Sequence, residues 1–301
     1  GSRASLLKID GVPTRGQHDR QIPAPVRAAY AVAMNCNGNA ACFNFDPDDP
    51  MCPSWKGTRE RIHSPKGRAS LMREWLRLLS ERGVDPVAES RNVRETSFVR
   101  ALLPRLRNTR AKLRGEYDFS HEVHTAMAGC LACKSCATQC PVRVDVAEFR
   151  SQFLELYYGR YSRPSKDYVV GSLEVLLPYL AKLPGAYNWA VSNRGVQALM
   201  RDALGLVDHP KLSGVNLNAA VHQRGIAWAT PAALAALPAA RRAQAVVVVQ
   251  DAFTSYFETP LVLDLLELLN RLGFVPLLAP FKPNGKPLHV HGFLKAFQRT
   301  A

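Results

Sequence analysis

Hydrophobic residues recur with a helical period over the first two thirds of the chain. The strongest pattern follows Ser64-Pro65, where one face carries Leu71, Trp75, Leu78 and Leu79. Another covers 145–158, begins at a capping Asp145, and turns inward Val146, Phe149, Phe153, Leu154 and Tyr157. We expect further helices over 26–34, 97–114, 166–183 and 187–204, with a kink or break at Pro104.

The last third of the chain has a different pattern. After a loop-rich passage over 208–242, the run Ala245-Val-Val-Val-Val249 is typical of a strand buried on both faces. The pattern over 261–272 predicts an amphipathic helix closed by Gly273, and 274–278 predicts a second strand. The fold class is therefore mainly α with a C-terminal α/β part that contains a βαβ unit. The chain ends soon afterwards, so we expect this part to be truncated.

Positive charge is concentrated in one segment. The chain has 39 Lys+Arg against 25 Asp+Glu, a net charge of +14, and residues 56–114 account for +10 of it. Clustered basic residues are a footprint of phosphate binding, but no helix-turn-helix, zinc-finger or RNA-binding signature accompanies them. We therefore favour a helix face packed against another domain, and expect no nucleic-acid partner.

No stretch reaches the roughly 18 to 20 apolar residues of a membrane span, because Pro231 and Pro238 interrupt the longest candidate, 227–240. The first residues do not form a signal peptide. We expect a cytoplasmic protein, with peripheral association to the inner membrane left open. In a reducing compartment, thiols bind metals or carry out redox chemistry more often than they form disulfides.

The densest chemical motif is Cys130-Leu-Ala-Cys133-Lys-Ser-Cys136-Ala-Thr-Gln-Cys140-Pro141. Its spacing, C-x2-C-x2-C-x3-C-P, is that of bacterial iron–sulfur proteins, in which the fourth cysteine ligates the other cluster when two are present. Zinc sites usually separate two ligand pairs by a dozen or more residues, so we interpret this motif as a 4Fe–4S site rather than a zinc site.

The remaining cysteines form a looser set, Cys36, Cys42 and Cys52. Because Cys52 precedes Pro53 as Cys140 precedes Pro141, we expect Cys52 to complete a cluster held by Cys130, Cys133 and Cys136. A second cluster would then have Cys36, Cys42 and Cys140, with one corner open to a ligand such as Asn37, Asn39, Asp46 or His63. The alternative is that Cys36 and Cys42 are ordinary buried thiols. Gly38 suits a loop whose backbone amides approach sulfur.

Several runs resemble the iron–sulfur half of the large bacterial FAD-linked oxidoreductases, of the D-2-hydroxyglutarate dehydrogenase type. They are Met34-Asn-Cys-Asn-Gly-Asn39, Met51-Cys-Pro-Ser-Trp55, Thr58 to Ala69, the Cys130 to Pro141 motif, Gln250-Asp-Ala-Phe-Thr-Ser255 and Pro280 to Leu288. Related iron–sulfur subunits carry Cys-Cys-Gly motifs in their C-terminal domain, whereas this chain has no cysteine after Cys140.

The resemblance implies four parts. These are a linker from a missing FAD domain (1–24), an α-helical ferredoxin-type domain (25–165), a helical connector (166–240) and an α/β domain (241–301). It further implies an electron-transfer module that passes electrons from FAD to an external acceptor while a 2-hydroxy acid, D-2-hydroxyglutarate, is oxidised to 2-oxoglutarate. The substrate-oxidising residues would lie on the missing domain, so the catalytic residues are unknown. The alternatives are a free-standing iron–sulfur subunit that docks on a separate flavoprotein, as in glycolate oxidase or glycerol-3-phosphate dehydrogenase, and a basic nucleic-acid-binding protein with a structural cluster.

Overall fold

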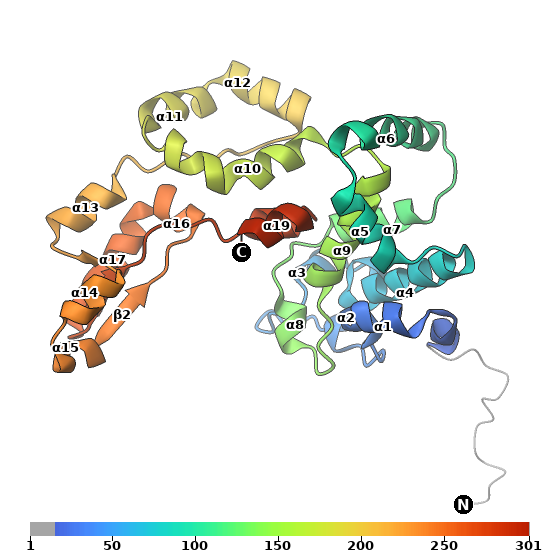
Figure 1. Cartoon of the computed structure of the whole chain (residues 1–301), viewed down its shortest axis with the longest axis horizontal. Coiled ribbons are helices and arrows are strands. Elements are labelled where there is room, and N and C mark those ends of the chain that lie inside the picture. The colour runs from blue at the N-terminus through green and yellow to red at the C-terminus, as the bar shows by residue number, and fades with distance from the viewer. Residues whose placement is uncertain (1–15, 301) are drawn as a thin grey trace, which may run out of the picture. The chain divides into compact units, whose positions relative to one another are not determined.

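The computed structural model describes residues 16–300, whose contacts divide them into two compact units (Figure 1). Unit 1 comprises residues 16–163 and 290–294, and unit 2 comprises 164–289 and 295–300. Of the predicted linker, residues 1–15 lie outside the described residues.

Unit 1 is helical. Its α-helices are α1 (Ala24–Ala29), α2 (Ala31–Met34), α3 (Pro53–Thr58), α4 (Pro65–Glu81), α5 (Pro86–Glu95), α6 (Phe98–Leu113), α7 (Ser120–Ala128), α8 (Ser135–Gln139) and α9 (Val146–Arg160). Three short 3-10 helices complete it: η2 (Gln17–Gln21), η3 (Ala41–Phe43) and η4 (Arg61–His63).

The core of unit 1 forms around α4 and α9. Ser64 caps α4 by accepting a hydrogen bond from Gly67 N at 2.9 Å, and Asp145 caps α9 by accepting from Glu148 N at 3.0 Å. The ring of Phe153 packs edge-on against Trp75 with centroids 5.1 Å apart. The helices predicted at 145–158 and after Ser64 are thus confirmed, although the buried face of α4 runs through Met72, Trp75, Leu76 and Leu79.

Residues 290–294 close over α9. Gly292, at φ 69°, lies so close to this helix that a Cβ atom would stand 2.7 Å from Leu154 Cβ and 2.9 Å from Ser151 O. Arg150 donates to the carbonyl of Val290, and Arg163 to those of His291 and Gly292. The residues that lead into this segment, Lys286–Val290, form the short helix α18.

Helix α6 leaves an apolar face uncovered. It continues through Pro104, so the break expected there does not occur. Its packed face carries the buried Ala101 and contacts α9. The large apolar side chains that remain 40–79% exposed are Phe98, Val99, Leu102, Leu103, Leu106 and Leu113. At about 100° per residue they share an arc of about 140° beside the arginines.

Unit 2 contains a small parallel sheet with the strand order β1-β3-β2. The strands are β1 (Ala227–Trp228), β2 (Ala245–Val248) and β3 (Val275–Leu278). The remaining helices are α10 (Ser165–Leu180), α11 (Pro184–Ser192), α12 (Arg194–Leu199), the π-helix η5 (Met200–Leu204), α13 (Leu217–Gln223), α14 (Pro231–Ala236), α15 (Ala239–Ala243), α16 (Ala252–Tyr256), α17 (Thr259–Arg271), α18 and α19 (Leu294–Thr300).

The predicted βαβ unit is confirmed as β2-α17-β3, and Leu263 and Leu266 of α17 pack with Leu278 of β3. One expectation was wrong. The predicted strand is not buried on both faces, because Val247 within β2 is 43% exposed and Val249, directly after β2, is 79% exposed. The passage 208–242, expected to be rich in loops, contains β1, α13, α14 and most of α15. Within residues 16–300, no helix is both long and apolar enough to cross a membrane.

Candidate functional site

Four cysteine side chains line one pocket of unit 1. Cys52 stands directly before α3, Cys130 and Cys133 lie in the loop between α7 and α8, and Cys136 belongs to α8. Cys52 and Cys136 each interact electrostatically with Cys130 and Cys133. Two segments distant in sequence therefore bring their thiols to one place.

Both segments reach the pocket in left-handed backbone conformations. Seven non-glycine residues in the described part of the chain have positive φ, and six belong to the two cysteine-containing segments: Ala40, Cys52, Arg59, Ala132, Lys134 and Arg143. Each such residue costs about 1–2 kcal/mol, so the surrounding contacts must impose the conformation. The wrapped loops turn backbone amides toward sulfur: Ala132 N lies 3.4 Å from Cys130 Sγ, and Val146 N lies 3.5 Å from Cys136 Sγ.

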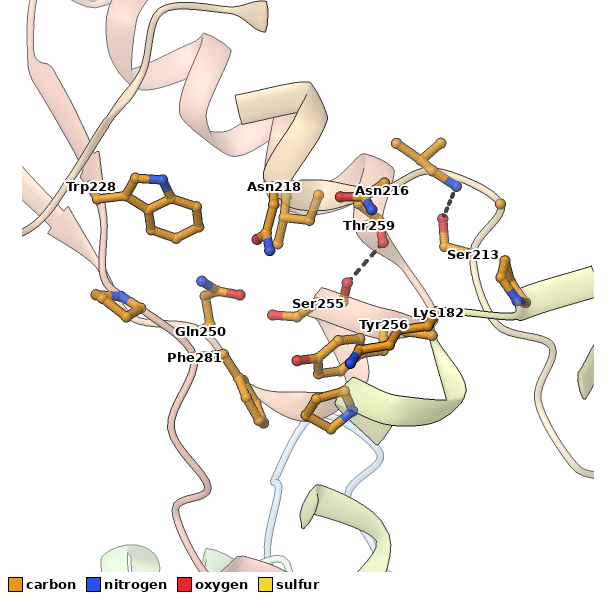
Figure 2. Close-up of a pocket in the computed structure, with 17 residues that line it drawn as sticks. Lys182, Ser213, Asn216, Asn218, Trp228, Gln250, Ser255, Tyr256, Thr259 and Phe281 are labelled. Atoms are coloured by element: carbon orange, nitrogen blue, oxygen red, sulfur yellow. Dashed lines mark hydrogen bonds between the residues drawn. The ribbon is translucent and has the colours of Figure 1, made fainter. Parts of the chain in front are cut away.

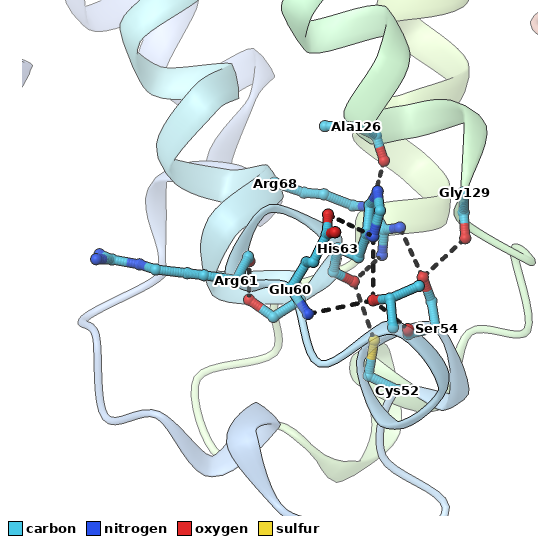
Figure 3. Close-up of polar contacts among 10 residues, drawn as sticks. Cys52, Ser54, Glu60, Arg61, His63, Arg68, Ala126 and Gly129 are labelled. Atoms are coloured by element: carbon cyan, nitrogen blue, oxygen red, sulfur yellow. Dashed lines mark hydrogen bonds and ion pairs between the residues drawn. The ribbon is translucent and has the colours of Figure 1, made fainter.

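A buried arginine borders the same pocket. Arg68 of α4 is 1% exposed and donates to Ala126 O at 2.8 Å, to Ser54 Oγ at 2.9 Å and to the carbonyl of His63 (Figure 3). Among the residues that the structure describes, no carboxylate forms an ion pair with it. A buried cation without an acidic partner is costly unless another negative group faces it. The pocket residues that can carry negative charge are the cysteines, as thiolates.

Burial governs the acidity of these thiols. It raises the pKa of Cys136 to about 12. It also raises the pKa of Cys52, against the opposing effects of the Trp55 amide and the Arg68 charge. A raised pKa favours the protonated thiol at Cys52 and Cys136, so a metal that binds these two residues must displace their protons.

The other three cysteines are less clearly grouped. Cys36 and Cys42 are buried, and Cys42 interacts electrostatically with Cys36 and Cys52. Burial raises the pKa of Cys42. Cys140 is half-buried and does not line the pocket of the four cysteines. Pro53 lines that pocket, whereas Pro141 does not.

The proposed non-cysteine ligands each make a local hydrogen bond. Asn37, Asn39 and Asp46 each accept a hydrogen bond from a backbone amide two residues further on. The ring of His63 pairs through Nδ1 with Thr58 Oγ1 at 3.0 Å. The carbonyl of Gly38 accepts from Lys66 Nζ at 3.0 Å. Across residues 16–300, no three His, Cys, Asp or Glu side chains are arranged to hold a single metal ion.

A role for Arg68 or Ser54 was not predicted from the sequence, although they lie in the runs Thr58 to Ala69 and Met51 to Trp55. A signal was available for the arginine. Position 68 falls at i−4 and i−7 from Met72 and Trp75, so this arginine shares the apolar face of α4. A charged residue on a buried helix face is a candidate for function.

The sequence has clear relatives. It is 54% identical over 301 residues to the D-2-hydroxyglutarate dehydrogenase of Pseudomonas putida and 49% identical over 302 residues to that of Escherichia coli. Along its whole length, this chain is similar to D-2-hydroxyglutarate dehydrogenases. The similarity to the Haemophilus influenzae D-2-hydroxyglutarate dehydrogenase is 45% over 293 residues.

The chain spans about 30% of the length of these dehydrogenases. No family model matches the sequence, and no solved structure matches it.

Proposed function

We propose that this chain is the electron-transfer part of a larger FAD-linked dehydrogenase that oxidises a 2-hydroxy acid, D-2-hydroxyglutarate. The names of the relatives support the substrate class, and their greater length leaves room for the flavin-binding part. The observation that carries the proposal is the convergence of Cys52, Cys130, Cys133 and Cys136 on one pocket.

The pocket residues fit a 4Fe–4S cluster. Each thiolate of such a cluster binds a different iron, so the ligands need not surround a single point as they do for one metal ion. The pocket has four thiols, no carboxylate and one buried cation, Arg68. A cluster would supply one-electron transfer, and could so carry the two electrons of reduced FAD singly to an acceptor.

The chain's own residues define the surroundings of the site. The amides of Ala132 and Val146 donate toward sulfur, and hydrogen bonds of this kind raise a cluster's potential. The charge of Arg68 acts in the same direction, because it stabilises added negative charge. Cys133 is exposed, which gives an electron partner an approach to the site.

Anaerobic reconstitution of the full chain tests the proposal. We expect about four irons and four sulfides for each cluster, with this cluster lost in Cys52→Ser and Cys133→Ser. Cys42→Ser is the matched control: it leaves the iron content unchanged if one cluster is present, and removes about four of eight irons if there are two. Bound zinc without iron would refute the assignment.

We further propose that the exposed apolar face of α6 receives the flavin-bearing part. This face carries Leu103, which is 75% exposed, and no acidic residue interrupts 96–115. Leu103→Asp should abolish the association of this chain with the separately produced flavin-bearing part in analytical ultracentrifugation. Leu268→Asp, at a 53% exposed leucine of α17, should leave it intact. Equal effects of the two would contradict this docking surface.

A further inference from the structure

Unit 2 contains a pocket of about 790 Å³ to which no role has been assigned (Figure 2). Its lining follows the carboxyl ends of all three strands. Trp228 is the last residue of β1, Gln250 follows β2, and Phe281 follows β3. In open parallel sheets, ligands bind in the crevice at this edge.

Two sequence motifs that the electron-transfer proposal does not use meet in this pocket. The run Gln250 to Ser255 supplies both of its end residues, and the run Pro280 to Leu288 supplies Pro280 and Phe281. Asp251 holds the first motif in place by accepting from the amides of Phe253 and Thr254, at the start of α16. Each motif thus places side chains at the edge of the sheet.

The pocket offers flat apolar surfaces. Trp228, Tyr256 and Phe281 contribute aromatic rings, and the last two pack edge-on with centroids 5.1 Å apart. Figure 2 shows these rings bordering the same open space as Asn218 and Gln250. Aromatic walls of this kind hold planar ligands by stacking.

The polar groups of the pocket are suited to hydrogen bonding with a largely uncharged ligand. The hydroxyl of Ser255, a residue 2% exposed, has no hydrogen-bond partner in the described part of the chain. Gln250 donates to Ala279 O at 2.7 Å, which fixes its amide at the end of β2. Asn218 adds a second amide. A buried hydroxyl that lacks a partner is unfavourable, so a bound ligand that pairs with Ser255 gains affinity.

Charge narrows the ligand class. Among residues 16–300, no Asp or Glu lines the pocket, and Lys182 is the one charged residue that does. A dicarboxylate such as 2-hydroxyglutarate would bring two negative charges to one ammonium group. A neutral or singly charged ring matches better, because the amides and hydroxyls can bond to its carbonyl oxygens.

We propose that this pocket binds a planar conjugated ring bearing carbonyl oxygens, the chemistry shared by quinones and flavins. The ring would stack against Trp228, with its carbonyl oxygens facing Asn218 and Ser255. This inference does not depend on the iron–sulfur assignment, since its residues all belong to unit 2.

Isothermal titration calorimetry of the full chain tests it with three probes. Ubiquinone-1, whose ring has no free position for addition of the chain's thiols, represents quinones. Riboflavin, which has the flavin ring without a phosphate charge, represents flavins. The third probe, 2-oxoglutarate, is a dianion without a ring. We expect one of the two ring probes to bind saturably, and the probe that binds shows whether the pocket takes a quinone or a flavin. We expect no binding of 2-oxoglutarate. Failure of both ring probes to bind, or binding of 2-oxoglutarate alone, would overturn the proposal.

Variants locate the binding. Trp228→Leu should lower the affinity for the ring probe by about tenfold or more. Asn218→Asp, at an exposed position, should lower it by a similar factor, because it places a negative charge opposite a carbonyl oxygen of the ring. Trp189→Leu is the matched control, because Trp189 is 70% exposed in unit 2 and does not line the pocket. Unchanged affinity in Asn218→Asp with native circular dichroism would place the ring elsewhere and refute the site.

Discussion

Arg68 donates to Ser54 Oγ at 2.9 Å, and Ser54 in turn donates to Gly129 O at 2.8 Å. This relay joins α4 to the start of α3 and to the residue before Cys130 (Figure 3). The two segments that carry the four pocket cysteines are therefore positioned by one buried guanidinium.

Replacing this guanidinium should destabilise unit 1. Arg68→Met removes three hydrogen bonds, one to the buried Ala126 and two to the half-buried His63 and Ser54, and we expect it to lower the free energy of unfolding by about 2–4 kcal/mol. Urea denaturation followed by circular dichroism measures this. Arg91→Met, at an exposed position of α5, is the control and should stay within about 0.5 kcal/mol. A loss as small as the control's would show that the relay contributes nothing.

Two glycines should respond in opposite ways to alanine. A Cβ atom at Gly67 would lie 2.0 Å from Arg61 O, a contact with backbone that cannot turn aside. Gly67→Ala should therefore cost about 3 kcal/mol or more. Nothing lies within 4 Å of a Cβ atom at Gly57 in α3, so Gly57→Ala should stabilise by roughly 0.5–1 kcal/mol. Thermal unfolding of both variants decides, and a reversed order would be incompatible with this packing.

Two phenylalanines of unit 1 should differ in how much they contribute to stability, because one is buried and the other is exposed. Phe153 is fully buried against Trp75, and Phe153→Ala should lower the free energy of unfolding by about 3–5 kcal/mol. Phe98 is 62% exposed on α6, and Phe98→Ala should change it by no more than about 0.5 kcal/mol. Chemical denaturation compares them. A large loss from Phe98→Ala would mean that α6 is covered in the chain alone.

The stability of unit 1 should fall with mild acid because of His121. Burial, reinforced by the charge of Lys112, lowers the pKa of His121 below its usual 6.5. The unfolded chain then binds more protons than the folded chain as pH falls through about 6.5, so stability is lost in that direction. The groups that face this ring are Lys112, Asp118, Tyr157, Arg160 and Tyr161.

His121→Gln should flatten this dependence between about pH 7 and 5 in urea titrations of the full chain. His222→Gln, at an exposed position of α13, should leave the slope as it is. The assignment to His121 fails if both variants keep the slope.

The sequence predicted a helix or strand correctly where one hydrophobic period extends over enough residues. The βαβ unit could be predicted from the valine run, from the amphipathic pattern over α17 and from Gly273, which follows that helix. β1 could not, because its two residues are too short to show an alternation. The exposure of Val247 and Val249 also escaped prediction, since β-branched composition reports strand preference and not which faces are covered.

The cysteines of the site could be predicted from the sequence, whereas the residues that surround them could not. The Cys-Pro pairs suggested that Cys52 would join the Cys130 motif, and the structure places them around one pocket; that they bind a cluster remains a prediction. Arg68 escaped because its role depends on contacts with residues far along the chain, such as Ala126. His121 and His124, shortly before Cys130 in the sequence, pair with the hydroxyls of Tyr157 and Tyr158.

The core of unit 1 also sets an order of events during synthesis. Val26, Trp55 and Trp75 are buried in one cluster with Phe149 and Phe153 of α9, so the first half of this unit has no finished core until α9 has left the ribosome. The thiols of Cys36, Cys42 and Cys52 are made first and buried last. During that interval these three thiols are accessible to oxidants, and this exposure ends when the folded unit buries them.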